Sequence, residues 1–232
     1  GSDLGFNVMA NFKKKFPKRF FMEGISEQNI VGTAAGMALR GFIPYVNTIA
    51  TFLTRRSFEQ NVIDLGLHKL PVRLVGNGGG LVYGPLGPTH QAIEDISIMT
   101  SIPNMSVFSV CDKNEMRQLI LQSQKWKGPM YIRLARGNEK IISQGKRFKI
   151  GEIVTFIKPE KYTIFSTGSL TQEALQSVKL LKMKGFNVGL IHVPSLKPIN
   201  LNNLKLKLKN IDYIFSIEEH ISKGGLGSIL LD

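Results

Sequence analysis

Apolar and polar positions along the chain form two alternating kinds of segment. Apolar runs of strand length occupy residues 42–49, 71–76, 105–110 and 130–135. Longer segments with the helical spacing of apolar residues occupy 27–40, 53–67, 91–101 and 112–124. Because strands that alternate with helices build parallel sheets covered by helices, the pattern predicts an α/β domain.

The alternation fails once and then resumes. Residues 136–161 are rich in Lys, Gly and Ile without a clear period, so we expect a linker there. Strand and helix patterns then return at 162–166, 169–184, 187–193 and 213–217. The predicted fold class is α/β, with two mostly parallel sheets flanked by helices, in domains at 1–135 and 162–232. The chain opens on a strand-to-loop phrase and stops within what reads as a new helix, so both ends are expected to be truncated.

Composition indicates a folded protein without a membrane span. The chain has 232 residues, of which 43% are hydrophobic, enough for one large or two ordinary cores. Its apolar runs end well before the ~20 residues that a membrane helix needs, and we read no leader at its start. The single cysteine, Cys111, cannot form an internal disulfide. It fits a reducing compartment, so we expect a cytoplasmic protein.

The formal net charge of +13 does not by itself indicate nucleic-acid binding. Basic residues are spread along the chain, with their densest clusters at 13–19 and 204–210. This spread favours a solvated surface and leaves open an acidic partner or a small anionic substrate.

A lone carboxylate, Glu27, opens a helical segment that is otherwise small and apolar. Ser26 is a candidate N-cap, and the helix dipole favours negative charge in the first turn, so Glu27 could be an ordinary surface residue. The turns that follow, at 30–39, offer no polar face to solvent and predict close packing on all sides. A carboxylate buried there must be hydrogen-bonded or keep its proton, which makes Glu27 a candidate functional group.

A glycine- and proline-rich segment at 76–91 follows a predicted strand directly. Open α/β sheets bind ligands at this edge. The segment matches neither G-x-G-x-x-G nor G-x-x-x-x-G-K-[ST], so a phosphate cradle has weak support. His90, near its end, is either a structural histidine that caps the next helix or a polar group in a cleft.

Together these segments resemble the transketolase family. Five segments resemble the pyrimidine-binding domain of that family: RFFMEGISEQNIVGTAAGMALRGFIPYV, TFLTRR, HKLPVRLVGNGG, GPTHQAIEDISIMTSIPNMSVFSVCDKNEMRQLI and GPMYIRLAR. Residues 162–227, with STGSLTQEAL and SIEEHISKGGLG, resemble its C-terminal domain. Deoxyxylulose phosphate synthase and the β subunits of 2-oxo acid dehydrogenases share both domains. GPTHQAIEDI and SIPNM are most similar to transketolase and the synthase.

The resemblance implies thiamine diphosphate as cofactor, which reacts through the C2 carbanion of its thiazolium ring. In the family, a glutamate at the position of Glu27 hydrogen-bonds N1′ of the aminopyrimidine and favours the imino tautomer that removes the C2 proton. Glu27 is therefore the expected catalytic and cofactor-binding residue. Phe52 matches the aromatic region that packs on the pyrimidine, although an aromatic residue in a helix is ordinarily part of the core.

The resemblance also implies substrate contacts. His90 matches a histidine that faces substrate oxygens, and it is a candidate catalytic and substrate-binding residue. Arg136 matches an arginine that holds substrate phosphate, or it forms a salt bridge within the linker. Arg55, which follows Phe52 closely, is a similar candidate that we assign to cofactor binding. A planar guanidinium binds two oxygens at once, which suits phosphate.

Two departures from the family pattern concern substrate recognition. The family reads D-G-P-T-H, with an aspartate that contacts a sugar hydroxyl, and Leu86 takes that place here. A second family histidine falls at Asn77 or Gly78. Because a buried apolar side chain cannot replace a hydrogen-bond acceptor, we expect cofactor activation to persist while the recognised hydroxyls change. Ketol transfer on a modified or deoxygenated sugar fits this better than pentose phosphate exchange.

The G-D-G motif with which the family binds the diphosphate through Mg²⁺ does not occur in this sequence. The resemblance therefore implies the small subunit of a split transketolase, with the Mg²⁺ ligands on a large partner subunit in an α2β2 assembly. The expected activity is transfer of a two-carbon ketol unit from a ketose to an aldehyde or modified-sugar acceptor.

Two alternatives stay open. The chain could be a β-like subunit of a 2-oxo acid dehydrogenase or a synthase relative, which would decarboxylate its donor. It could also be a non-catalytic partner that binds sugar phosphates, although the presence of Glu27, Phe52 and His90 argues against that.

Overall fold

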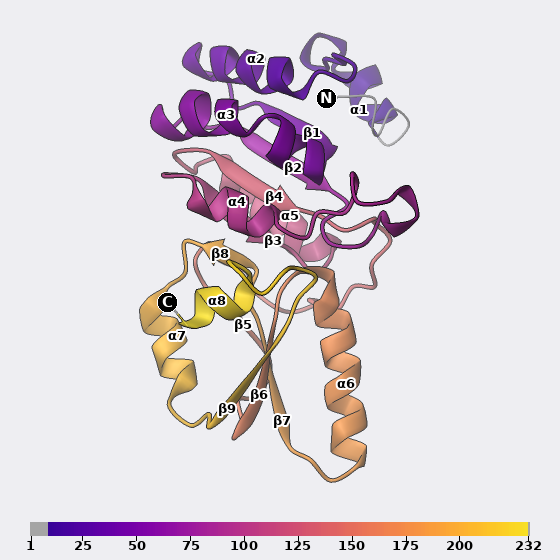
Figure 1. Cartoon of the computed structure of the whole chain (residues 1–232), viewed down its shortest axis with the longest axis vertical. Helices are drawn as coiled ribbons and strands as arrows, with labels where there is room; N and C mark the ends of the chain where they lie inside the picture. Colours follow the sequence, from indigo (N-terminus) through magenta and orange to yellow (C-terminus); the bar gives the residue numbers. More distant parts are fainter. Residues whose placement is uncertain (1–8, 232) are drawn as a thin grey trace.

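Two sheet-based units follow one another along the long axis of the molecule (Figure 1). The structure is a computed structural model and describes residues 9–231, so the strand-to-loop phrase expected at the N-terminus lies outside the described residues. The N-terminal unit holds β1 to β4, and the C-terminal unit holds β5, β6, β7 and β9. The predicted α/β class with two mostly parallel sheets is confirmed.

The first sheet has four parallel strands in the order β1-β2-β4-β3. Their bounds are Tyr45–Ile49 for β1, Arg73–Asn77 for β2, Ser106–Ser109 for β3 and Met130–Arg133 for β4. Each lies within or overlaps a predicted apolar run. The carboxyl ends of these parallel strands meet at one edge of the sheet, where the glycine-rich segment begins.

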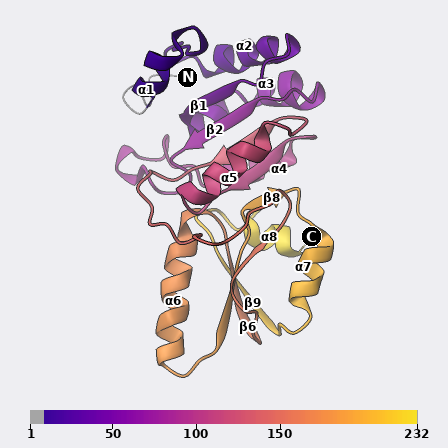
Figure 2. The same cartoon turned by 180° about the vertical axis from the view of Figure 1, so that it is seen from behind.

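Helices cover both faces of this sheet, with α2, α3 and α4 on one face and α5 on the other (Figures 1 and 2). These helices are α2 at Glu27–Leu39, α3 at Phe58–Gln60, α4 at Asp95–Ser101 and α5 at Lys113–Ser123. The unit also contains the helix α1 at Ala10–Lys15 and the 3₁₀ turns η1 at Pro17–Arg19 and η4 at Gly84–Leu86. The core beneath α2 and α4 takes Val46 from β1, and it takes Leu74, Val107 and Tyr131 from β2, β3 and β4. In β2, β3 and β4 the next residue faces the α5 side, so both faces are apolar and these strands read as continuous runs.

The segment predicted as one helix at 53–67 contains two π-helical stretches. They are η2 at Phe52–Arg56 and η3 at Asn61–Leu67, and the short α3 separates them. A π-helix is wider than an α-helix, occurs mostly in single turns and is frequent at functional sites. The apolar period could not distinguish it from an ordinary helix.

The second sheet has the order β5-β7-β6-β9, and β6, β7 and β9 are parallel. Its strands are β5 at Val154–Ile157, β6 at Tyr162–Ser166, β7 at Val188–His192 and β9 at Tyr213–Ile217. Its helical elements are η5 at Gly168–Leu170, α6 at Thr171–Met183, α7 at Leu201–Leu208 and α8 at Leu226–Leu231. β5 pairs antiparallel with β7 and lies within the stretch expected to be a linker. Four residues give too short a pattern to predict a strand. Within residues 9–231, no helix is both long and apolar enough to cross a membrane.

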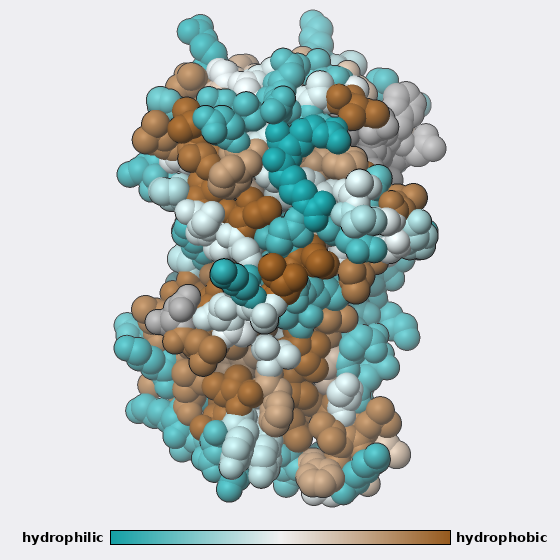
Figure 3. Space-filling view, in the orientation of Figure 1, coloured by the Kyte–Doolittle hydropathy of each residue, from teal (hydrophilic) through white to brown (hydrophobic). Residues whose placement is uncertain are grey.

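Strand β9 forms the outer edge of the second sheet. Its side chains Tyr213, Ile214 and Phe215 are exposed, and Tyr213 stacks on Tyr162 with ring centroids 5.1 Å apart. Hydrophobic surface gathers over this half of the molecule (Figure 3). Apolar side chains at an unpaired edge are unusual for a solvated surface.

A short strand from the C-terminal half joins the N-terminal sheet. β8, at Ser195–Lys197, pairs antiparallel with β3 and covers the edge of that sheet. The Nζ atom of Lys197 donates to the carbonyl oxygens of Thr100 and Ile102 at the end of α4, at 2.6 and 2.7 Å. β8 was not predicted, because a three-residue strand acquires its partners only in the folded chain. The helix α7 was not predicted either.

A buried hydrogen-bonded chain also links the two units. Nε2 of His192 lies 2.9 Å from Oε2 of Glu115, and Nδ1 of His192 lies 2.7 Å from the hydroxyl of Thr171, which accepts from Ser166. Oε2 of Glu115 also accepts from the backbone N–H of Cys111. Burial raises the pKa of the Cys111 thiol, so this cysteine is poorly suited to act as a nucleophile.

Candidate functional site

Glu27 is buried at the first turn of α2. The residue is 2% exposed, and its Oε2 atom accepts a hydrogen bond from Nη1 of Arg56 at 2.7 Å. Ser26 occupies the N-cap position, but its hydroxyl donates to the carbonyl oxygen of Glu23 rather than capping the helix. The interpretation of Glu27 as an ordinary surface residue is therefore wrong.

Helix α2 packs on one side only. Ala34, Ala35 and Ala38 are buried against the core, whereas Gly36 is exposed and has no atom within 4 Å of the position of a Cβ. The prediction that this helix packs closely on all sides is wrong within this chain. Small residues on the open side leave the helix backbone accessible.

An arginine that the sequence did not single out connects the separate site candidates. The guanidinium carbon of Arg56 lies over the Phe52 ring, 4.4 Å from its centroid, while Nη1 bonds Glu27. The Phe52 ring in turn meets the His90 ring edge to face, with centroids 5.0 Å apart. The fold thus brings together three residues that are far apart in the chain. The signal in the sequence is the pair of arginines after Phe52, of which the prediction names Arg55.

Arg55 fastens the loop that carries His90. Its Nε bonds Glu94, Nη1 donates to the carbonyl oxygen of Pro88 at 3.1 Å, and Nη2 donates to that of Gln91 at 2.9 Å. The hydrogen bond to Glu94 raises the pKa of Arg55. All three guanidinium nitrogens are engaged, so the geometry favours a positioning role over the phosphate contact expected from the sequence.

His90 lies on an exposed loop ahead of α4. Its backbone N–H donates to the carbonyl oxygen of Gly87 at 3.0 Å, and Nδ1 lies 2.9 Å from the hydroxyl of Thr89. The helix predicted from residue 91 begins later, at Asp95. The interpretation of His90 as a helix cap is therefore wrong, and its Nε2 edge faces away from the Thr89 contact.

The start of the glycine-rich segment is tightly held. The side-chain amide of Asn77 donates to the Asn47 side chain and to the carbonyl oxygen of Thr48 on β1. Gly78 has a φ of +76°, and a Cβ there would lie 2.1 Å from the Tyr83 ring, so only glycine fits. Asn77 is thus engaged within the sheet in this chain.

Leu86 lies in η4 and is 57% exposed. The sequence predicts a buried apolar side chain at this position, and that prediction is wrong within this chain. An exposed leucine does not close a pocket here.

A buried charge network, which the sequence does not indicate, packs against the glycine-rich loop and holds it in place. Oδ2 of Asp95 accepts from Nε of Arg133 at 2.8 Å and from the hydroxyl of Tyr131 at 2.7 Å. Nη2 of Arg133 donates to the carbonyl oxygens of Ala92 and Glu219, which lie in different units. Burial opposes the charge of Arg133, but the Asp95 carboxylate keeps the pKa of Arg133 above its usual value.

This network leaves no room for side chains in the loop above it. A Cβ on Gly79 would lie 2.5 Å from the Arg133 side chain, and one on Gly80 would lie 2.6 Å from Glu219. The sequence does not indicate Arg133, because this residue ends an apolar strand and resembles any charge at a strand terminus.

Arg136 follows β4 and is exposed. Within residues 9–231 no ion pair of Arg136 is found, so the salt bridge considered for the linker is not formed in this chain. Its guanidinium remains open to a ligand.

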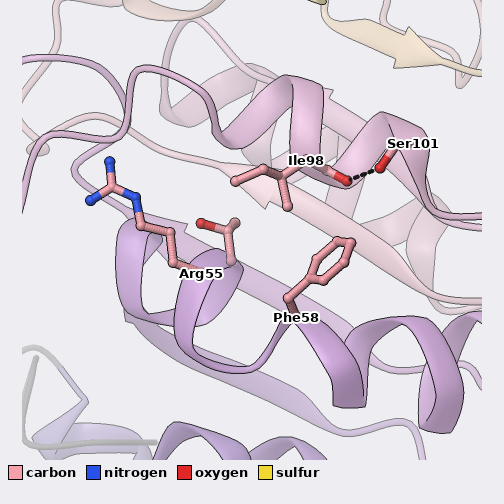
Figure 4. A pocket seen from close by; sticks show the side chains of 5 residues that line it. Arg55, Phe58, Ile98 and Ser101 are labelled. Atoms are coloured by element: carbon pink, nitrogen blue, oxygen red, sulfur yellow. Dashed lines mark hydrogen bonds between the residues drawn. The ribbon is translucent and has the colours of Figure 1, made fainter.

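A groove of about 310 Å³ lies between η2, α3 and α4. Its lining consists of Thr54, Arg55, Phe58, Ile98 and Ser101 (Figure 4). Glu27, Phe52 and His90 do not line it, so it is separate from the cluster described above.

Comparison with known proteins gives two matching family models. The model described as "Transketolase, pyrimidine binding domain" matches residues 4–140, and "Transketolase, C-terminal domain" matches residues 153–232. One subunit of the apulose-4-phosphate transketolase of Actinobacillus succinogenes is 36% identical over 97% of this chain and 72% of its own length.

This chain also matches a longer curated protein and a solved structure, and it spans a different share of each. The 1-deoxy-D-xylulose-5-phosphate synthase of Caldanaerobacter subterraneus subsp. tengcongensis is 33% identical over 97% of this chain, which spans 36% of that protein. A solved structure described as "Split gene transketolase, inactive beta4 tetramer" superposes with a TM-score of 0.89 at 34% identity, over 99% of this chain and 75% of that one.

Proposed function

Because the chain belongs to the transketolase family, we propose that it is the small, pyrimidine-binding subunit of a split transketolase that depends on thiamine diphosphate. Its activity would be transfer of a two-carbon ketol unit from a ketose to an aldehyde or modified-sugar acceptor. The observation that carries this proposal is the buried carboxylate of Glu27, which already binds a planar nitrogen group over the Phe52 ring.

The residues of this cluster fit an aminopyrimidine. Glu27 offers a buried carboxyl group, and Phe52 offers an aromatic face that the guanidinium carbon of Arg56 approaches to 4.4 Å from the ring centroid. When bound, thiamine diphosphate supplies a nucleophilic carbon at C2 of its thiazolium ring. Glu27 would hold the proton shared with N1′ of the pyrimidine, and Phe52 would fix the orientation of that ring.

His90 would face the oxygens of the substrate. Its ring contacts Phe52, and the loop that carries it is fastened by Arg55 on one side and by Arg133 on the other. A histidine can donate or accept a proton near neutral pH, which suits the proton transfers of ketol transfer. Arg136, accessible after β4, would hold a substrate phosphate.

The partner would be a large subunit that carries the diphosphate and Mg²⁺ ligands. The sequence lacks the G-D-G motif, and a relative named as one subunit of a transketolase and a split-gene structure both support a two-polypeptide enzyme. We assign an α2β2 assembly. The buried, unpaired Cys111 fits a reducing compartment such as the cytoplasm.

The substrate would be a phosphorylated sugar with altered hydroxyl recognition. The apulose-4-phosphate relative supports a sugar phosphate, and the family aspartate is replaced by Leu86 and the second family histidine by Asn77 or Gly78. A decarboxylating reaction of the synthase type is the second candidate, supported by the synthase that matches 97% of this chain.

The test is reconstitution with the cognate large subunit. The complex is offered ketose phosphates, including apulose 4-phosphate, or pyruvate, each with a set of aldehyde acceptors. Ketose consumption without release of CO₂ would support ketol transfer, whereas pyruvate consumption with CO₂ would support the synthase-type reaction. If thiamine diphosphate did not bind the complex, the proposal would be wrong.

A further inference from the structure

Arg56 occupies a position between the two groups that the proposed function assigns to the pyrimidine. Its Nη1 atom lies 2.7 Å from Oε2 of Glu27, and its guanidinium carbon lies 4.4 Å from the centre of the Phe52 ring. A hydrogen bond between a planar edge and the Glu27 carboxyl, and an aromatic face at Phe52, are the two contacts expected of an aminopyrimidine that shares a proton with Glu27 at N1′. A guanidinium has both properties, because it is planar and carries N–H donors on its edge.

The neighbouring arginine shows that this placement is not a general property of the segment. Arg55 makes three hydrogen bonds to the loop of residues 88–94 and is anchored there. Arg56 has a single hydrogen-bonding partner and one aromatic contact among the described residues, and its side chain is 44% exposed. Its guanidinium can therefore leave toward solvent without releasing any other element of the fold.

The buried carboxylate gives the free chain a reason to hold Arg56 there. An ionised carboxylate that is 2% exposed is costly unless a cation or several donors compensate it. The Phe52 face adds an attraction for a cation that lies over it. A ligand that reaches Glu27 would have to replace both contacts.

We propose that Arg56 is an internal occupant of the pyrimidine position, and that a planar nitrogen heterocycle, which shares a proton with Glu27 through a ring nitrogen, must displace it to reach Glu27 and Phe52. This inference rests on the proposed function of Glu27 and Phe52. Arg56 would thereby lower the apparent affinity for the heterocycle in proportion to the fraction of molecules in which the position is filled. If Arg56 fills it in about nine molecules of ten, the apparent Kd rises about tenfold.

The test uses the full chain and 4-amino-5-hydroxymethyl-2-methylpyrimidine, the pyrimidine half of the cofactor, which does not require the diphosphate and Mg²⁺ ligands. Its Kd is measured by NMR titration for the unmodified chain and for Arg56→Ala and Arg56→Lys. Arg40→Ala is the matched control, because Arg40 is an exposed arginine at the far end of α2. A double variant, Arg56→Ala with Glu27→Gln, tests whether the bound probe contacts Glu27.

We expect Arg56→Ala to bind the probe about tenfold more tightly than the unmodified chain, Arg40→Ala to match the unmodified chain, and the double variant to lose the gain. Arg56→Lys, which keeps the charge but lacks a planar group, should lie between them and serves if the alanine variant does not fold. Equal Kd values for all single variants would overturn the role of Arg56 while leaving the pyrimidine site intact. Absence of binding in every variant would also overturn it. The proposed function would then be judged separately, by cofactor binding to the reconstituted complex.

Discussion

Arg55 and Arg56 are adjacent in η2, yet their guanidinium groups do different things. Arg55 is bonded to Glu94 and to two backbone carbonyls of the His90 loop, whereas Arg56 bonds the buried carboxylate of Glu27 and covers the Phe52 ring. One arginine thus fixes the frame of the site, and the other lies within it.

Glu27→Gln and Glu27→Ala should leave folding and subunit assembly nearly unchanged, because Glu27 contributes one hydrogen bond to a half-exposed arginine. C2 deprotonation of bound thiamine diphosphate should slow by about 10²- to 10⁴-fold, the range of a positioned acid or base. Hydrogen–deuterium exchange at C2 in the reconstituted complex measures this step alone. Exchange at the native rate in both variants would make Glu27 a packing residue.

The chain by itself should bind intact thiamine diphosphate weakly, because the G-D-G motif is missing from its sequence. Adding the large subunit should produce tight, Mg²⁺-dependent binding. Calorimetry with and without the large subunit, and with and without Mg²⁺, provides the comparison. Micromolar binding by the chain alone would contradict the split-enzyme assignment.

Arg55→Ala should loosen the loop that carries His90. Loss of three hydrogen bonds to residues 88–94 should raise amide exchange across that loop and reduce kcat/KM, while the global unfolding transition changes little. Hydrogen exchange followed by mass spectrometry locates the effect, and Arg40→Ala controls for loss of charge. If exchange in the loop were unchanged, Arg55 would not be a positioning residue.

Leu86→Asp should alter the substrate preference of the reconstituted enzyme without a large stability cost, because the side chain is 57% exposed in this chain. Restoring a carboxylate at the family position should favour ordinary ketose phosphates, and Leu86→Asn tests whether charge is needed. The kcat/KM ratio for two donors is the measurement. An unaltered ratio in a folded variant would place residue 86 outside the pocket.

Asp112 should make stability depend on acid pH. Its carboxylate N-caps α5 through Asn114 and Glu115, and it accepts from the backbone N–H groups of Ile142 and Ser143, both at 2.8 Å. Burial opposes ionisation, but these donors and the Ser143 hydroxyl hold the pKa of Asp112 below its usual value. The stabilisation is therefore present above the unfolded pKa of about 3.9 and is lost as pH falls through the lower folded pKa.

Asp112→Asn should cost about 0.5–2 kcal/mol at pH 7, because the amide cannot accept on both sides. The difference from the unmodified chain should shrink as pH falls below about 4. Urea unfolding at pH 7, 5 and 3.5 measures it, with Asp212→Asn as an exposed control. A difference independent of pH would contradict the assigned role.

The sequence by itself determined the fold class, because the period of its apolar residues follows the strands and helices that bury them. It also indicated Glu27, since a carboxylate that opens an apolar helix is costly wherever the helix packs. The resemblance added Phe52 and His90, and the fold brings both into contact. Residues that are far apart in the chain, such as Glu27, Phe52 and His90, can therefore be recognised from the sequence as candidates for one site.

Only the tertiary structure decided how these candidates are connected and which charges serve the frame. The roles of Arg55 and Arg56 depend on the direction of each side chain from a π-helical segment, and that direction is not encoded in the apolar period. Arg133 became recognisable only when Asp95 and Glu219 came within reach across the two units. β5 and β8 likewise needed partners from distant segments. Contacts of this kind depend on the packing of the whole chain, because short-range patterns hold no information about which distant group will compensate a buried charge.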